Sequence, residues 1–142
     1  KSKKMATTTA TLTLSSTDLL SDSLSVSATQ TLYKAGTTTG LDGIQYERLE
    51  VATGDVYDMI DATAAGANKA NKIYVCNKNT TETNYIDIYI AAVNIGRLYA
   101  GDWMFIPFEA HAATQDVGLE AIGAAQVVEF ALIHEGKTLV AS

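Results

Sequence analysis

Apolar and polar side chains alternate with a period of two residues along most of this chain. Clusters of Gly, Asn, Asp or Thr interrupt the alternation about every ten positions. Residues that alternate in this way lie on opposite faces of a β-strand, so the pattern indicates short strands with one buried face, separated by turns. The spacing predicts an all-β protein: an antiparallel β-sandwich, jelly-roll-like, of about seven to nine strands.

The first half of the chain is rich in Thr and Ser, and threonine favours strands. Leu12 and Leu14 alternate with threonines, and a second alternating run contains Leu24 and Val26. We expect the first 40 residues to be an arm or leading strand rather than a second domain. A single sandwich domain is therefore predicted over residues 1–142, with residues 1–15 as an extended N-terminal arm.

Further strands are predicted over residues 44–51 and 56–60, although the alternation there is imperfect. The alanine-rich residues 61–70 are predicted to be a loop, because Gly66 and the lack of apolar spacing argue against a helix. Residues 137–141 are predicted to add a short edge strand.

In the second half, residues 72–76 and 85–91 are predicted to form a hairpin around a polar tip at 77–84. In the second of these strands, isoleucines 86, 88 and 90 share one face and are expected to be buried. The range 103–108 is the most hydrophobic strand, and its proline is expected at a strand end or sheet edge. The last long strand is predicted over residues 126–134.

Composition excludes several function classes. The chain has 142 residues, is 47% hydrophobic and 18% charged, and carries a formal net charge of −6, so a nucleic acid is not expected as a partner. Cys76 is the single cysteine, which excludes an intrachain disulfide. No apolar run approaches the ~18 residues that span a bilayer, and the first residues do not resemble an export signal. We therefore expect a soluble protein with no membrane partner.

The residues that usually carry chemistry are few and scattered. His111 and His134 have no metal-ligand spacing, and Cys76 has no partner cysteine, base or orienting group in a recognisable motif. Asp55 and Asp61 flank a turn but do not match a calcium loop. The chain also lacks a nucleophile elbow, a phosphate-binding loop and a dinucleotide fingerprint. No catalytic, metal or cofactor-binding residues are predicted, no cofactor is expected, and the protein is not expected to be an enzyme.

The N-terminal lysines 1, 3 and 4 place a basic end on an acidic chain. They form either a solvated tail or an arm that lies on an acidic patch of a partner.

The second half of the chain contains IYVCNKN, then a polar segment, YIDIYIA, IGRLYAGDWMFIPF and VVEFALI. This order resembles small β-sandwich virion proteins of tailed bacteriophages, particularly marine phages. The threonine-rich SDSLSVSATQTLYKAGTTTGLDG of the first half also resembles their leading segment. The resemblance covers most of the chain and describes a fold and its core. It implies that Trp103, Phe105, Ile106 and Pro107 are core and edge residues rather than ligand contacts.

The resemblance implies a virion structural protein, foremost a capsid decoration or cement protein that binds and stabilises the head shell. Its partners would be the major capsid protein and neighbouring copies of itself, as a homo-oligomer. It would be made in the host bacterial cytoplasm and lie on the outer surface of the capsid. Neck, tail or fibre proteins of the same kind are an alternative. A different alternative is a carbohydrate- or receptor-binding module that uses Tyr85, Tyr89, Tyr99 and Trp103 as an aromatic surface.

Overall fold

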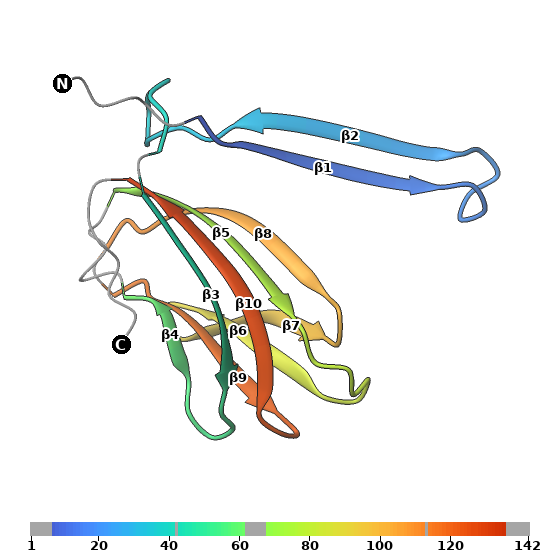
Figure 1. Cartoon of the computed structure of the whole chain (residues 1–142), viewed down its shortest axis with the longest axis vertical. Coiled ribbons are helices and arrows are strands. Elements are labelled where there is room, and N and C mark those ends of the chain that lie inside the picture. Colours follow the sequence, from blue (N-terminus) through green and yellow to red (C-terminus); the bar gives the residue numbers. More distant parts are fainter. Residues whose placement is uncertain (1–6, 42, 62–67, 113, 136–142) are drawn as a thin grey trace.

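The computed structural model describes residues 7–41, 43–61, 68–112 and 114–135. These residues form ten β-strands and no helix: β1 (Thr9–Ser16), β2 (Leu24–Thr31), β3 (Gly43–Val51), β4 (Tyr57–Ile60), β5 (Ala70–Asn77), β6 (Tyr85–Ile90), β7 (Val93–Tyr99), β8 (Trp103–Glu109), β9 (Val117–Ile122) and β10 (Gln126–His134). Strands β3 to β10 form a sandwich of two four-stranded sheets, and β1 and β2 form a separate hairpin (Figure 1). The predicted all-β sandwich is confirmed.

The first sheet has the strand order β3-β10-β5-β8, and the second sheet has the order β4-β9-β6-β7. Every pair of neighbouring strands is antiparallel. Consecutive strands pass from one sheet to the other at every connection except the β6–β7 turn. This alternation is the strand arrangement of a jelly roll, as the sequence predicts.

The core lies between the two sheets and is built from the inward-facing residues of both. Strand β10 alternates strictly, with Val128, Phe130 and Leu132 fully buried and their neighbours half-buried. Ile86 and Ile88 of β6 are also buried, as the spacing predicts, and Ile90 packs against the same core. The period-two pattern therefore identifies the buried face of these strands correctly.

Two buried amides link the sheets at one end of the sandwich. The Asn77 side chain at the end of β5 donates hydrogen bonds to the Leu98 carbonyl (2.8 Å) and to Gln126 Oε1 (3.0 Å). Gln126 Nε2 lies 2.8 Å from the Tyr85 carbonyl oxygen and 3.1 Å from that of Ile122. Because Asn77 and Gln126 belong to the first sheet and their carbonyl partners to the second, these bonds fix how the sheets meet.

The predicted hairpin between residues 72–76 and 85–91 is wrong. Strand β5 pairs with β10 and β8, whereas β6 pairs with β7 and β9 in the other sheet. The hairpin of this region is β6–β7, and it turns at Ala91 and Ala92, which have positive φ angles of 53° and 64°. Two left-handed residues form the tight turn that suits the twist of a two-stranded hairpin.

The edge strand β8 contains the aromatic-rich segment of the sequence. Pro107 lies on this edge strand, as predicted. Ile106 packs against the main core, and Phe105 packs against a smaller cluster at the hairpin base. The resemblance implies that Trp103 lies in the core or at an edge. Its side chain is half exposed on the edge strand, so it lies at the edge and not in the core.

Three predictions concern residues that are not described. Lysines 1, 3 and 4, residues 62–67 of the predicted loop, and the predicted strand at 137–141 lie outside the described ranges.

Candidate binding surface

The β1–β2 hairpin has two faces of opposite character. The register pairs Leu12 with Ala28 and Leu14 with Val26, so these side chains share one face with Ala10. The other face carries only Thr and Ser side chains: Thr9, Thr11, Thr13, Ser15, Ser25, Ser27, Thr29 and Thr31. Amphipathic strands normally bury their apolar face, but Leu12, Leu14 and Val26 are all exposed.

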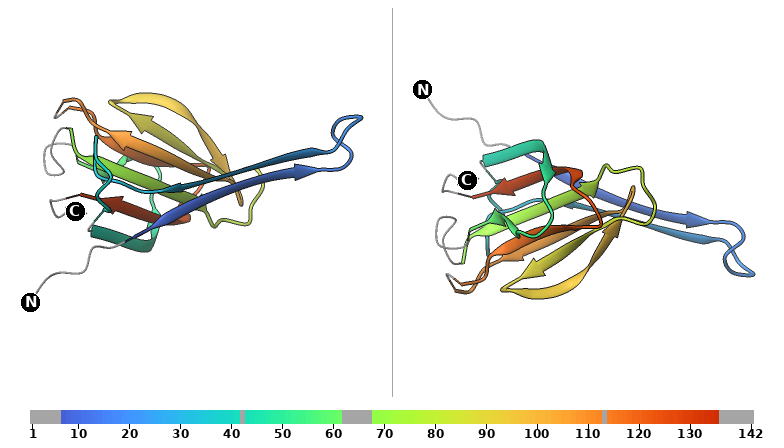
Figure 2. Two further views of the ribbon diagram at one scale, coloured as in Figure 1. Left: turned by 90° about the horizontal axis from the view of Figure 1, so that it is seen from above. Right: turned by 90° about the horizontal axis from the view of Figure 1, so that it is seen from below.

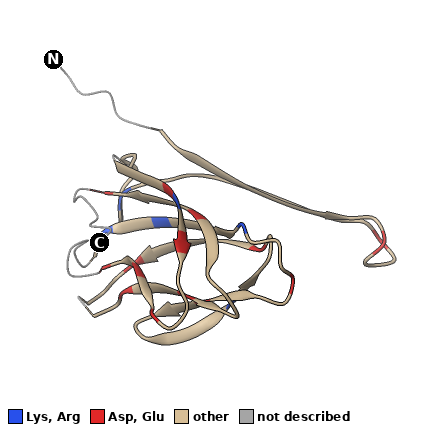
Figure 3. Cartoon of the chain, turned by 60° about the horizontal axis from the view of Figure 1, so that its bottom comes forward, with Lys and Arg blue, Asp and Glu red and all other residues tan. Residues whose placement is uncertain are grey.

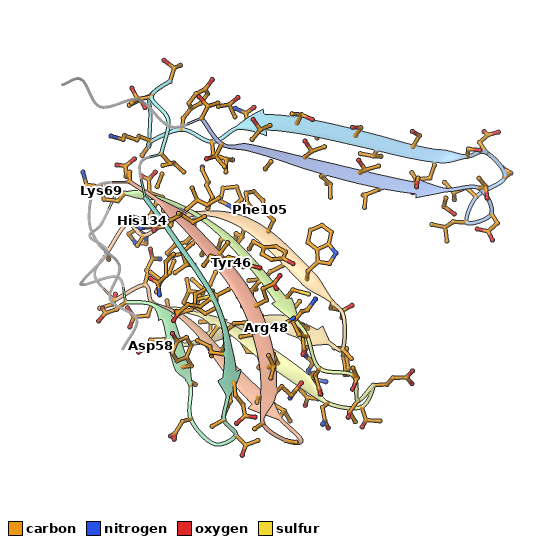
Figure 4. The ribbon with its side chains drawn as sticks, viewed as in Figure 1. Tyr46, Arg48, Asp58, Lys69, Phe105 and His134 are labelled. Atoms are coloured by element: carbon orange, nitrogen blue, oxygen red, sulfur yellow. The ribbon has the colours of Figure 1, made fainter. Side chains whose placement is uncertain are left out.

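The hairpin is attached to the sandwich at its base. Leu32 and Leu41 are buried there in a small cluster with Ala70, against which Ala10 and Phe105 pack. The Glu135 carboxylate accepts a hydrogen bond from the Ala35 backbone amide at 2.6 Å. Lys69 lies 3.8 Å from the same carboxylate, and Figure 4 places it with His134 at this end of the sandwich. These contacts hold the base, while the distal part of the hairpin extends beyond the sandwich (Figure 2).

The outer face of the first sheet is also apolar. The strand register places Tyr46, Ala131, Tyr74 and Phe105 side by side across all four strands. A neighbouring row holds Ile44 next to Ile133. Ile44 is 66% exposed and Tyr46 63% exposed. The first two outward positions of β3, Ile44 and Tyr46, are thus apolar, whereas the inward Gln45 and Glu47 are polar, which is the reverse of an ordinary sandwich strand. From Arg48 onward the ordinary pattern returns, because Leu49 and Val51 face the core.

A groove of about 530 Å³ lies between the hairpin and this sheet. Leu12, Ala28 and Gln30 line it from the hairpin, and Tyr74, Trp103 and Phe105 line it from β5 and β8. The Tyr74 and Trp103 rings lie 6.5 Å apart and are tilted against one another. Figure 4 shows Phe105 beneath the hairpin near its base. The hairpin therefore overlies only the β5 and β8 side of the sheet and leaves β3 uncovered.

The two tyrosines in the middle row of this face are uncharged. Burial, together with a hydrogen bond to the Cys76 thiol, raises the pKa of Tyr74 to about 12. A hydrogen bond with Glu129 raises the pKa of Tyr46. Both phenols therefore stay neutral at physiological pH. Glu129 also lies 3.9 Å from Arg48, so charges on the sheet face are paired at its centre.

Charge is distributed unevenly between the hairpin and the sheet. Asp18 and Asp22 are the only charged residues between positions 7 and 32. Both lie at the hairpin tip, where Figure 3 shows the acidic colour. Lys72 lies on the outer face of β5 and Arg48 on that of β3, according to the strand register. The tip is thus acidic, whereas the sheet face carries charges of both signs, since Glu129 and Glu50 lie on it as well.

The residues considered for catalysis come from three different elements of the fold. His134 is buried at the end of β10, whereas His111 is exposed in the loop after β8. Cys76 is buried on β5. Within the described ranges, no three His, Cys, Asp or Glu side chains gather closely enough to hold a metal ion.

Asp58 lies in β4 between Asp55 and Asp61, the two acids that flank a turn without matching a calcium loop. Partial burial raises the pKa of Asp58, and the nearby carboxylates of Asp116 and Asp61 add to the effect. Asp58 lies on β4 of the second sheet (Figure 4), away from the groove described above.

The four aromatic residues of the carbohydrate hypothesis do not share one surface. Tyr85, Tyr89 and Tyr99 lie on β6 and β7 of the second sheet, and Trp103 lies on the first sheet. The Tyr85 and Tyr99 rings are 5.2 Å apart, and the Arg97 guanidinium lies 4.3 Å from the Tyr85 ring centre. The Tyr89 hydroxyl donates to Glu120 at 3.0 Å. The three tyrosines thus contact one another or charged side chains, Arg97 and Glu120, on the second sheet.

Sequence reasoning did not identify the binding surface, although one signal for it was present. The imperfect alternation of residues 44–51 reflects apolar side chains on the outward face of β3. Such a pattern indicates apolar side chains on the face of the sheet that points away from the core.

Comparison with protein-family models, with curated proteins and with solved structures finds no match. The part of the chain that the structure describes contains no helix long and apolar enough to cross a bilayer.

Proposed function

We propose that this protein is a virion structural protein, a capsid decoration or cement protein that binds the outer surface of a tailed-phage head and stabilises it. The proposal rests on the resemblance of the sequence to small phage β-sandwich proteins and on two exposed apolar surfaces, one on the hairpin and one on β3. A protein that works by covering and linking its neighbours needs surfaces of this kind and no catalytic centre.

The observation that carries the proposal is the projecting hairpin. Its apolar face is exposed over Leu12, Leu14 and Val26, and its distal half extends past the body to which it belongs (Figure 1). A two-stranded hairpin alone is marginally stable in water, so an exposed apolar hairpin is best explained by a partner that covers it. An arm that extends beyond its own domain links adjacent subunits in an assembly.

The mechanism would be additive. Each copy would bury a modest apolar area against the neighbouring subunits, and the lattice of the shell would repeat that contact many times. Because avidity grows with the number of linked contacts, weak individual contacts are sufficient to strengthen the shell.

Quantitative mass spectrometry of purified particles tests the location. Decoration predicts a copy number comparable with that of the major capsid protein. A few copies per particle would contradict decoration and assign the protein to the neck, tail or fibre.

Binding of the purified protein to undecorated heads tests the surface. The double substitution Leu14→Asp/Val26→Asp should abolish binding, because it places two charges on the apolar face of the hairpin. Thr13→Asp/Ser27→Asp is the matched control, since this adjacent cross-strand pair lies on the polar face. Equal loss with both variants would contradict the proposal. Specific binding to a glycan array, with no binding to heads, would favour the carbohydrate-binding alternative.

A further inference from the structure

We infer that the apolar face of the hairpin binds the outer face of the first sheet of a second copy of this chain. The inference deepens the proposed function, on which it rests, by naming the partner of the same surface. Three observations support it: two complementary apolar faces on one chain, compatible dimensions, and opposite charges beside them.

The two faces are complementary and only partly used within one copy. The hairpin presents aliphatic side chains, chiefly Leu14 and Val26 in its distal half. The sheet presents Ile44 and Tyr46 on β3, which are exposed. Across the groove, the hairpin of the same copy faces β5 and β8 and does not cover β3. Each copy therefore has two exposed apolar surfaces, the distal half of its hairpin and the Ile44 and Tyr46 patch on β3.

The dimensions of the two surfaces are compatible. The hairpin strands are eight residues long, and β3 and β10 are nine. At about 3.3 Å per residue, the distal half of the hairpin extends roughly 13 Å, and Ile44 and Tyr46 lie roughly 7 Å apart along β3. The half of the hairpin that its own copy leaves free is therefore long enough to cover this exposed apolar pair.

Charge complementarity favours a second copy as the occupant. The hairpin carries acids only, Asp18 and Asp22 at its tip. On the sheet face, Arg48 follows Tyr46 at the next outward position of β3, and its side chain is 60% exposed although it lies 3.9 Å from Glu129. A hairpin from another copy that covers Ile44 and Tyr46 would bring its acidic tip toward this exposed guanidinium. Opposite charges at the rim of an apolar contact mainly select the partner and its orientation.

The contact is heterologous, because a hairpin meets a sheet rather than another hairpin. Such a contact closes when two copies exchange hairpins or when several copies form a ring. Each copy then makes the contact twice, once with its hairpin and once with its sheet. A closed assembly therefore covers both apolar surfaces of every copy.

Complementation between two association-deficient variants tests this arrangement with the full chain. The hairpin variant is Leu14→Asp/Val26→Asp, and the sheet variant is Ile44→Asp/Tyr46→Asp. All four positions are exposed, so both variants should keep the sandwich fold, which circular dichroism and thermal unfolding would verify. Sedimentation velocity would show wild type as an oligomer and each variant alone as a monomer.

Mixing the two variants should restore a one-to-one complex, since one supplies an intact sheet and the other an intact hairpin. Thr13→Asp/Ser27→Asp should oligomerise like wild type. Asp18→Asn/Asp22→Asn should weaken association and reduce its dependence on salt.

Two results would overturn the inference. The first is a wild-type protein that stays monomeric at every concentration. If its hairpin variant nevertheless failed to bind heads, the proposed function would stand and the shell protein would be the occupant of the hairpin. The second is a wild-type oligomer together with a hairpin variant and a sheet variant that do not form a complex when mixed. That result would indicate that hairpins contact hairpins or that sheets contact sheets.

Discussion

At the scale of single residues, the stability of the sandwich depends on a buried polar contact between its sheets. Gln126 is buried, and its side-chain amide accepts a hydrogen bond from Asn77 Nδ2 and donates one to the Tyr85 carbonyl. Buried polar groups must be satisfied internally, because water cannot reach them. The amide pair therefore acts as a fixed link rather than as a surface feature.

We expect Gln126→Leu to lower the free energy of unfolding by about 3 kcal/mol, since it leaves buried donor and acceptor groups without a partner. Chemical denaturation monitored by tryptophan fluorescence would measure the change. Gln30→Leu is the control, because Gln30 is exposed on the hairpin, and its effect should stay within about 0.5 kcal/mol. Similar losses for the two substitutions would contradict the role assigned to Gln126.

A second residue-scale prediction concerns Gly43, at the start of β3. A Cβ added to Gly43 would collide with the His134 ring, which packs directly against it. Because His134 is buried, the ring cannot move away freely, and we expect Gly43→Ala to destabilise the fold by about 1–3 kcal/mol. Thermal unfolding would measure the loss.

Gly96 on β7 is the matched control, since nothing lies within 4 Å of a Cβ added there. Gly96→Ala should be neutral or slightly stabilising, because alanine restricts the unfolded chain. A loss at position 96 equal to that at position 43 would show that crowding by His134 is not the cause.

At the scale of elements, the sequence predicts strands better than it predicts their partners. The range 126–134 matches β10 residue for residue, because strict alternation identifies a half-buried strand. Alternation does not encode which sheet a strand joins, and so the pairing of 72–76 with 85–91 was wrong. Strand β9 was not predicted, because Gly118 interrupts its pattern. The structure gives the reason for that glycine: Val56 occupies the space of a Cβ.

The β6–β7 turn shows the same limit, because Ala91 and Ala92 lack the Asn-Gly signal that usually marks such turns. A left-handed alanine costs about 1–2 kcal/mol. We expect Ala91→Asn/Ala92→Gly to raise the free energy of unfolding by up to about 1 kcal/mol, after allowing for the greater freedom of unfolded glycine.

Equilibrium denaturation would measure this gain, with Ala131→Gly as the comparison. Ala131 lies within β10, where glycine should instead lower stability by about 1 kcal/mol. A loss at the turn as large as that in the strand would contradict the assigned turn geometry.

At the scale of the whole molecule, stability is unevenly distributed. The sandwich strands share one core. Among the described strands, β1 and β2 pair only with each other, and the small cluster around Leu32 and Leu41 anchors them. The hairpin face that we propose as a binding surface lies at this less stable end. Regions that bind partners often have low local stability, because they are completed only in the assembly.

Hydrogen exchange would reveal this gradient in dilute solution. Amides of β10 should exchange slowest, through unfolding of the whole sandwich. The Leu32 amide, which bonds the Thr8 carbonyl at 2.8 Å beside the small cluster, should be intermediate. Amides around Leu14 and Val26 should exchange fastest, because a two-stranded hairpin without a covered face opens readily.

Raising the protein concentration should slow exchange at the distal hairpin and leave β10 unchanged, because a partner molecule would then cover Leu14 and Val26. Slow exchange of the distal hairpin at the lowest concentration would contradict this prediction. It would mean that the hairpin is held by its own chain, and that its apolar face needs no second molecule.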